Sequence, residues 1–155
     1  MSFEEQIRNA INRGKQRGDQ QREAERAAEM SLEERKNLHG RYRLNLCDHI
    51  EKNLEQVTHM IPGFKYETVY GDRGWGGAIS RDDVLRGGTF YSRLEITVRP
   101  LTEQNLLTII GRGTVRNKEV FNWNHFAEIQ EVDDETFQKQ VDLWIIQYVE
   151  MFSGK

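Results

Sequence analysis

The spacing of the apolar residues changes at Pro62-Gly63, and this change constrains the fold more than any other feature of the sequence. Before it, apolar residues recur every three or four positions, as on one face of a helix. After it, apolar and polar residues alternate, as in strands that bury one face. Because proline and glycine end helices, the pattern predicts one long helix that ends before Pro62 and leads into a sheet. The helical stripe consists of Leu38, Tyr42, Leu46, Ile50, Leu54, Val57 and Ile61.

Four segments after this helix have the alternation or composition of strands: residues 64–70, 89–100, 106–117 and 119–130. Residues 78–85 are compatible with a short strand or with irregular chain. The connections are too short for the crossover helices that parallel strands require, so consecutive strands are expected to pair as an antiparallel meander.

A second helix is expected after the strands. Asp133 is a good N-cap, and Asp134 and Glu135 suit the positive end of the helix dipole. The expected buried stripe is Phe137, Val141, Trp144 or Ile145, Tyr148 and Phe152. The sequence therefore predicts an α+β fold: a single antiparallel sheet of about four strands in a meander, packed by the long N-terminal helix and a C-terminal helix.

A hairpin closed by residues 102–105 predicts how the two clearest strands pair. It places Glu95 opposite Arg112, and an opposite-charge pair across two strands supports this register. The same register sets Thr97 opposite Ile110, Arg99 opposite Thr108, Arg93 opposite Thr114 and Tyr91 opposite Arg116. One sheet face then carries an aromatic ring among arginines. Either Glu95 and the acidic C-terminal segment neutralise these arginines within the chain, or the face binds a partner or ligand. Its candidate residues are Tyr91, Arg93, Arg99, Arg112 and Arg116.

The opposite face of the same hairpin has two glycines at core positions. Gly111 is expected opposite Ile96, and Gly113 opposite Leu94. The missing side chains leave a trough, which a closely approaching helix, an aromatic ring or a ligand must fill. In the ligand alternative, the pocket would be lined by Trp75, Trp123 or Tyr91.

Residues 71–77, Gly-Asp-Arg-Gly-Trp-Gly-Gly, are expected to form a glycine-rich loop. No Gly-Lys-Ser/Thr sequence follows, and the preceding strand is of the antiparallel kind, so the loop lacks the features of a phosphate-binding loop. It is either a plain hairpin loop or a binding loop. In the second case Arg73 and Trp75 are its contact residues.

Residues 1–30 differ from the rest of the chain. Phe3, Ile7 and Ile11 recur every four residues on a short helix, which is predicted to stop at the first glycine. The remainder is rich in Gln, Glu, Arg and Ala and has almost nothing to bury. We expect residues 1–30 to be a charged helical extension, frayed or docked on a partner, and residues 31–155 to be a single α+β domain. Phe3, Ile7 and Ile11 are the candidate residues for self-association.

No constellation of residues in the sequence predicts catalysis, a metal site or a cofactor. Cys47 and His49 are two residues apart on the predicted helix, so they point in different directions. His39, His49 and His59 are spaced by ten residues, which rotates each by about 80° from the last, so they share no face. The single cysteine excludes an internal disulfide and a zinc site built on paired thiolates.

Charge and hydropathy further limit the classes of protein to which this chain could belong. No stretch approaches the ~18 apolar residues of a membrane-spanning helix, and the charged first residues do not match a secretory signal. Together with the single cysteine, these features predict a cytoplasmic protein without membrane association. The net charge of −3 lacks the basic character of many nucleic-acid-binding domains. Charge is nevertheless segregated: residues 86–118 contain six basic and two acidic residues, and residues 119–155 contain two basic and eight acidic ones.

These features favour a non-enzymatic module that binds protein partners or associates with itself, for example as a homodimer. The alternative is a small-ligand-binding protein or an enzyme, with its pocket near the glycine-rich segments. Binding of single-stranded nucleic acid on the basic sheet face is a third hypothesis, which the net charge disfavours.

Overall fold

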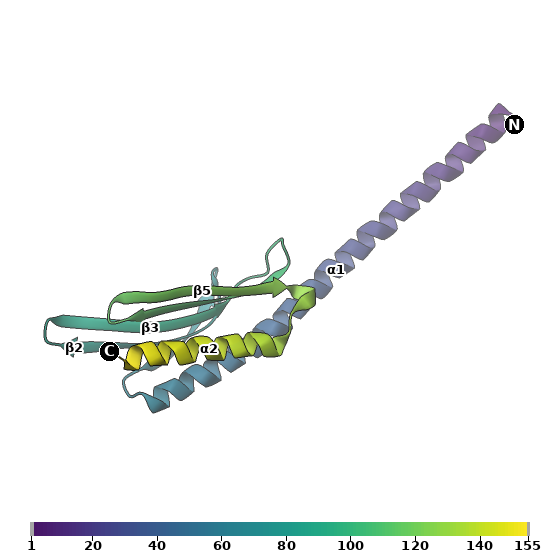
Figure 1. Ribbon diagram of the computed structural model, residues 1–155. Coiled ribbons are helices and arrows are strands. Elements are labelled where there is room, and N and C mark those ends of the chain that lie inside the picture. Colours follow the sequence, from purple (N-terminus) through teal and green to yellow (C-terminus); the bar gives the residue numbers. More distant parts are fainter. Residues whose placement is uncertain (1, 155) are drawn as a thin grey trace. The chain divides into compact units, whose positions relative to one another are not determined.

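The computed structural model describes residues 2–154, and of residues 27–30 it describes only the backbone. Over these residues the chain forms two α-helices and one five-stranded antiparallel sheet (Figure 1). The predicted α+β class, meander and two helices are confirmed, with five strands in place of about four. In chain order the elements are α1 (Phe3–Met60), β1 (Lys65–Gly71), β2 (Gly74–Leu85), β3 (Gly88–Val98), β4 (Leu106–Val115), β5 (Lys118–Glu128), a short 3-10 helix (Ile129–Glu131) and α2 (Asp134–Ser153).

The helix α1 continues through three glycines, Gly14, Gly18 and Gly40. The prediction that the first helix stops at Gly14 is therefore wrong. An interior glycine costs about 1 kcal/mol relative to alanine, and the Gln, Arg and Ala residues along this segment are good helix formers that offset the cost.

The chain divides within α1 into two compact units, Met1–Asn37 and Leu38–Lys155. We call residues 3–37 of α1 the arm. The second unit contains the remainder of α1, the sheet and α2. None of the helices in the described part of the chain is both long enough and apolar enough to cross a membrane.

The additional strand is β2, and it replaces most of the loop predicted at residues 71–77. β1 and β2 are joined by a two-residue turn, Asp72-Arg73, with Gly71 paired to Gly74. Both glycines have positive φ angles, 155° and 138°, which residues with a side chain rarely adopt. The glycines therefore permit a tight hairpin in place of a long loop.

The predicted register of β3 and β4 is confirmed. Glu95 pairs with Arg112 and Ile96 pairs with Gly111. Beyond the paired residues, the backbone N–H of Arg99 donates to the Thr108 carbonyl at 2.9 Å. The side chains of Arg99 and Arg112 consequently belong to one face of the sheet.

Tyr91 does not pair with Arg116, as the same register had implied. Arg116 and Asn117 form the turn between β4 and β5, and both have left-handed backbone conformations, with φ of 47° and 72°. Two such residues in succession are typical of two-residue hairpin turns. Tyr91 instead accepts a hydrogen bond from the backbone N–H of Asn117 at 2.8 Å. The turn therefore removes Arg116 from the predicted sheet face.

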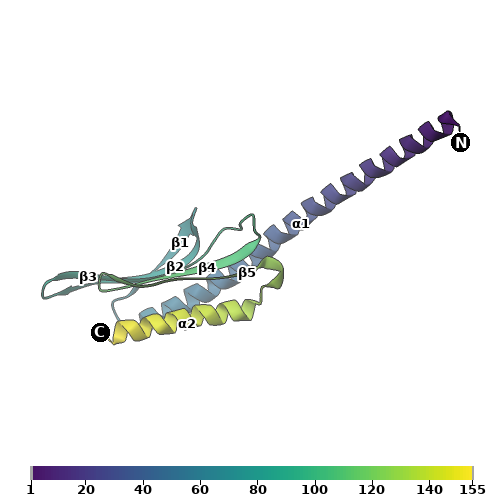
Figure 2. The same cartoon turned by 45° about the horizontal axis from the view of Figure 1, so that its top comes forward.

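Within the second unit, α2 and the part of α1 from Leu38 to Met60 lie on one face of the sheet, and no helix of the unit's described residues covers the other face (Figures 1 and 2). The hydrophobic core lies between these two layers, and the stripes predicted for the two helices supply its helical side. Its buried side chains include Leu46, Ile50 and Leu54 of α1, Leu94, Ile96 and Val98 of β3, and Phe137, Val141 and Trp144 of α2.

Aromatic rings fill the glycine trough. Of the three alternatives expected from the sequence, a closely approaching helix, an aromatic ring or a ligand, the structure shows the second. A Cβ atom at Gly111 would lie 2.7 Å from the Trp144 ring, and one at Gly113 would lie 2.5 Å from the Phe121 ring. The Phe121 ring in turn stacks on Trp123, with 4.1 Å between ring centroids. These contacts leave no room for a ligand at the two glycines.

Candidate functional site

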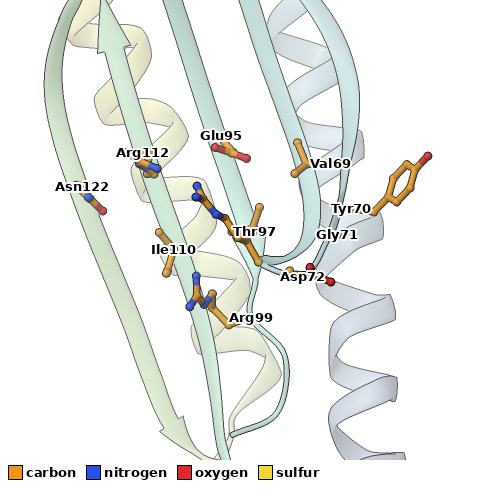
Figure 3. Close-up of a pocket in the computed structure, with 12 residues that line it drawn as sticks. Val69, Tyr70, Gly71, Asp72, Glu95, Thr97, Arg99, Ile110, Arg112 and Asn122 are labelled. Carbon is orange, nitrogen blue, oxygen red and sulfur yellow. The ribbon is translucent and has the colours of Figure 1, made fainter.

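The face of the sheet without helices, which we call the open face, is hollowed into a groove of about 510 Å³. The β1–β2 hairpin rises from the sheet in Figure 2 and forms one wall of this groove. Residues of β3, β4 and β5 form its floor, with both helices behind the sheet (Figure 3). We call it the arginine groove, and it is lined by Val69, Tyr70, Gly71, Asp72, Arg73, Gly74, Glu95, Thr97, Arg99, Ile110, Arg112 and Asn122.

A second hollow of about 240 Å³ continues the arginine groove along the open face. The two hollows share Glu95 and Arg112, and the second is also lined by Arg93, Thr114 and Glu119. The open face therefore carries an elongated depression along β3 and β4.

Three arginines line the arginine groove: Arg73, Arg99 and Arg112. None of them forms an ion pair with a carboxylate among the described residues. Arg99 and Arg112 extend over the open face from the region of β3 and β4 (Figure 3), whereas Arg73 comes from the β1–β2 turn. The lining contains two carboxylates, Asp72 and Glu95, so positive charge is in excess.

Arg93, a further candidate on this face, already has acidic partners. Its guanidinium contacts the Glu67 carboxylate and lies 3.8 Å from the Glu95 carboxylate. Burial lowers the pKa of Arg93, but hydrogen bonds with Glu67 and Tyr91 outweigh this effect and the pKa is raised overall. Among the described residues, Glu95 forms its ion pair with Arg93 on its own strand and not with Arg112 opposite it. Arg112 is thereby left without a carboxylate partner.

His39 holds the backbone next to the arginine groove. Its Nε2 lies 3.1 Å from the carbonyl oxygen of Arg99, and its side chain is buried. Burial lowers the pKa of His39, and a neutral imidazole can donate its Nε2–H to this carbonyl. The carbonyl of Arg99 is thus held by α1, while its side chain lies in the groove.

Trp75 and Arg116 lie on the helix side of the sheet. The Arg43 guanidinium of α1 lies over the Trp75 ring at 4.3 Å from its centroid. The Arg116 guanidinium lies over the Phe152 ring of α2 at 4.8 Å, and its Nη1 donates to the Phe152 carbonyl at 3.4 Å. The structure therefore brings three of the predicted residues into one groove and places the other four outside its lining. A binding role for the seven residues stays a prediction: Arg73, Trp75, Tyr91, Arg93, Arg99, Arg112 and Arg116.

Five polar lining residues have no place among the sequence candidates for binding: Tyr70, Asp72, Glu95, Thr97 and Asn122. Asn122 pairs with Arg112 across β4 and β5, so alternation along the last strand is a signal that places it on the open face. Tyr70 and Asp72 reach the groove because the β1–β2 hairpin bends over the sheet. The local sequence carries no signal for that bend.

Cys47 is not placed for nucleophilic chemistry. Its Sγ lies 3.5 Å from the Trp75 carbonyl oxygen, and burial raises the pKa of the thiol to about 11. Such a thiol is almost wholly protonated at neutral pH and is a poor nucleophile. Within the part of the chain that is described, no group of three or more His, Cys, Asp and Glu side chains is arranged to hold a metal ion.

Phe3, Ile7 and Ile11 are exposed on the arm. Because successive members are four residues apart on a helix, they share one side of it and form an apolar stripe. Their role in self-association stays a prediction.

Comparisons with protein-family models, with curated proteins and with solved structures found no match to this chain. The chemistry of the arginine groove is therefore the basis for assigning a function.

Proposed function

We propose that this chain is a non-enzymatic protein-interaction module that binds an extended acidic segment of a protein partner in the arginine groove. The observation that carries the proposal is the presence in one groove of Arg73, Arg99 and Arg112, which lack ion pairs with the described carboxylates. A guanidinium group forms two parallel hydrogen bonds with a carboxylate, so acidic side chains of a partner would satisfy these groups.

The form of the groove favours a polypeptide over a small molecule. Pockets for small ligands are mostly apolar and bury most of the ligand. The arginine groove mixes charged and apolar lining residues, and it continues into the hollow at Thr114 and Glu119. An extended segment could follow β3 and β4 in that direction.

A single-stranded nucleic acid matches the groove less well. Such ligands stack successive bases on aromatic rings. Tyr70 lines the arginine groove, but its ring points away from Arg99 and Arg112 (Figure 3), and Tyr91 lies beside Arg93 and outside the lining. The net charge of −3 also weakens attraction to a polyanion.

We place this function in the cytoplasm. A single free thiol, Cys47, suits a reducing compartment, where disulfides are rare.

The proposal is tested by fluorescence anisotropy with a labelled peptide of alternating glutamate and threonine, at about 0.15 M salt, where exposed charges are screened beyond about 8 Å. We expect saturable binding, and we expect Arg112→Gln and Arg99→Gln each to raise the Kd by about three- to tenfold, because each removes one charge pair. The matched controls are Lys65→Gln and Lys118→Gln, which remove one exposed positive charge each from β1 and β5. They should change the Kd less than about twofold, since screened charges outside the groove contribute little.

Two results would contradict the proposal. One is the absence of saturable binding of the acidic peptide. The other is an equal loss of affinity for the arginine and lysine variants, which would show that the peptide responds to overall charge and not to the groove. A peptide with glutamine in place of glutamate is the peptide control, and it should not bind.

A further inference from the structure

A second groove lies between the two helices, on the side of the molecule away from the arginine groove. Its volume is about 420 Å³, and its apolar lining includes Val57 and Met60 of α1 and Ile145, Ile146 and Val149 of α2. Met60 is 73% exposed and Ile146 is 62% exposed. We call it the helical groove, and it presents apolar surface that no described part of the second unit covers.

The arm carries a matching apolar stripe, since Phe3, Ile7 and Ile11 are all exposed and Phe3 is 78% exposed. At about 1.5 Å of rise per residue, the stripe extends about 12 Å along its helix. The helical groove is lined from Asn53 to Met60 on α1 and from Asp142 to Val149 on α2. Each wall therefore extends about 10.5 Å by the same measure. A helix laid in the groove would bury most of the stripe.

The charges next to the stripe and next to the groove are complementary. Basic residues follow the stripe along the arm at Arg13, Lys15 and Arg17, and no acidic residue lies between Glu5 and Asp19. A shallow hollow on α1 adjoins the helical groove through the shared residue Gln56. This hollow is lined by three acidic residues, Asp48, Glu51 and Glu55, and by one lysine, Lys52, so negative charge is in excess.

The order of these features sets the direction of the docked helix. Along the arm from Phe3 to Arg17, apolar residues come first and basic residues second. Along α1 from Met60 back to Asp48, the residues of the apolar groove end at Asn53, and two of the three acidic residues of the hollow, Glu51 and Asp48, come after them. Apolar surface meets apolar surface, and basic meets acidic, when the arm runs antiparallel to the α1 segment that lines the groove.

We infer that the arm of a second copy of this chain docks in the helical groove, antiparallel to α1. Each copy brings both a stripe and a groove, so two copies are mutually complementary without any further partner. The inference does not depend on the function proposed for the arginine groove, which lies on the other face of the sheet.

The first test is the molar mass of the full chain in solution, measured by light scattering after size exclusion. We expect a dimer for the wild-type chain and a monomer for Ile7→Glu, which places a charge in the stripe. Ile146→Glu and Met60→Glu change exposed positions in the groove and should also give monomers. The matched control is Val84→Glu, which places the same charge at an exposed apolar residue of β2 outside the groove and should remain dimeric.

Thermal unfolding followed by circular dichroism identifies any variant that fails to fold. If one groove variant does not fold, the oligomeric state of the other still tests the groove. The monomeric variants should bind the acidic peptide with the affinity of the wild-type chain, so a failure of one proposal is distinguishable from a failure of the other. A wild-type monomer would overturn the inference. Dimeric Ile146→Glu and Met60→Glu chains would also overturn it, because association would then not use the groove.

The second test is disulfide cross-linking between two copies in a Cys47→Ser background. An Ile7→Cys copy is mixed with a tagged Ile146→Cys copy and oxidised, and a disulfide-linked heterodimer is expected on a non-reducing gel. A tagged Val84→Cys copy is the control and should cross-link far less. Equal cross-linking of the Ile7→Cys copy to the Ile146→Cys and Val84→Cys copies, or no disulfide-linked heterodimer, would contradict docking between copies.

Discussion

The two faces of β3 and β4 consist of alternating residues of the same two strands, yet they obey different physical rules. On the face toward the helices, Leu94, Ile96 and Ile109 are completely buried. On the open face, Arg93 pairs with acidic neighbours while Arg112 does not. Along one strand, therefore, apolar packing determines the contacts of one side chain and charge interactions determine those of the next.

This difference shows why the covered face could be predicted more fully than the open face. Removal of apolar area from water is non-directional and depends chiefly on which face a residue occupies. Ion pairs on the open face depend on which of several carboxylates a guanidinium reaches. Glu95 illustrates this, since it pairs with Arg93 and not with its cross-strand neighbour Arg112.

The largest expected difference between the faces comes from two adjacent isoleucines of β4. Ile109→Ala should lower the free energy of unfolding by about 2–5 kcal/mol, because it leaves a cavity in the core. Ile110→Ala makes the same change on the open face, where the side chain is only half-buried, and should cost less than about 1 kcal/mol. Urea unfolding at a single pH measures both. Equal losses would mean that the two faces do not differ in packing as described.

Two glycine substitutions extend the comparison, with a smaller expected change in the free energy of unfolding. Gly111→Ala places a Cβ atom 2.7 Å from the Trp144 ring, and this overpacking should lower the free energy of unfolding by about 1–3 kcal/mol. Gly40→Ala meets no atom within 4 Å on α1 and should raise it by up to about 1 kcal/mol. Thermal unfolding with tryptophan fluorescence reports on both. A stabilised Gly111→Ala chain would show that the rings do not fill the trough.

The buried histidine on the helix side should make stability depend on pH. The pKa of His39 is lowered from its usual 6.5 by burial, so below pH 6.5 the unfolded chain binds more protons than the folded one at this site. The stability that neutral His39 supports is present above pH 6.5 and is lost as the pH falls through its lowered pKa. His39→Gln should therefore weaken the fall in the urea midpoint between pH 7 and more acidic solutions.

The exposed His59 on the same helix supplies the control for this measurement, as His59→Gln should keep the wild-type fall. If His39→Gln has the same acid sensitivity as the wild-type chain, another group is responsible.

The smallest effects are expected for the arginines of the open face. Arg93→Gln breaks contacts with two carboxylates and should lower the free energy of unfolding by about 0.2–1 kcal/mol. Arg112→Gln breaks no ion pair among the described residues and should change it by less than about 0.5 kcal/mol. Chemical unfolding at low and high salt separates the two, since the Arg93 effect should shrink at high salt. A larger loss for Arg112 would indicate that it supports the fold and is not available to a partner.

Much of the fold follows from local sequence. The stripe from Leu46 to Val57 predicted the buried face of α1, and alternation predicted the register that pairs Glu95 with Arg112. The predicted break at Gly14 was wrong because the helix-forming residues around a single glycine offset its cost.

The candidate site was predicted only in part. Alternation placed Arg99 and Arg112 on one face, because side chains two residues apart on a strand point the same way. Arg116 was expected there too, but two left-handed residues in the β4–β5 turn place it over the Phe152 ring instead. Trp75, expected in a loop, lies in β2 under the guanidinium of Arg43.

The sequence by itself determined the buried stripes of the two helices in the second unit and the register of β3 and β4, since helical and strand periodicities assign residues to faces without knowledge of the rest of the chain. Only the tertiary structure decided which charged groups share a groove. Arg73 and Arg112 are far apart in sequence, and they line one groove because the β1–β2 hairpin bends over the sheet. Such a bend depends on the packing of the whole sheet, so no local pattern encodes it.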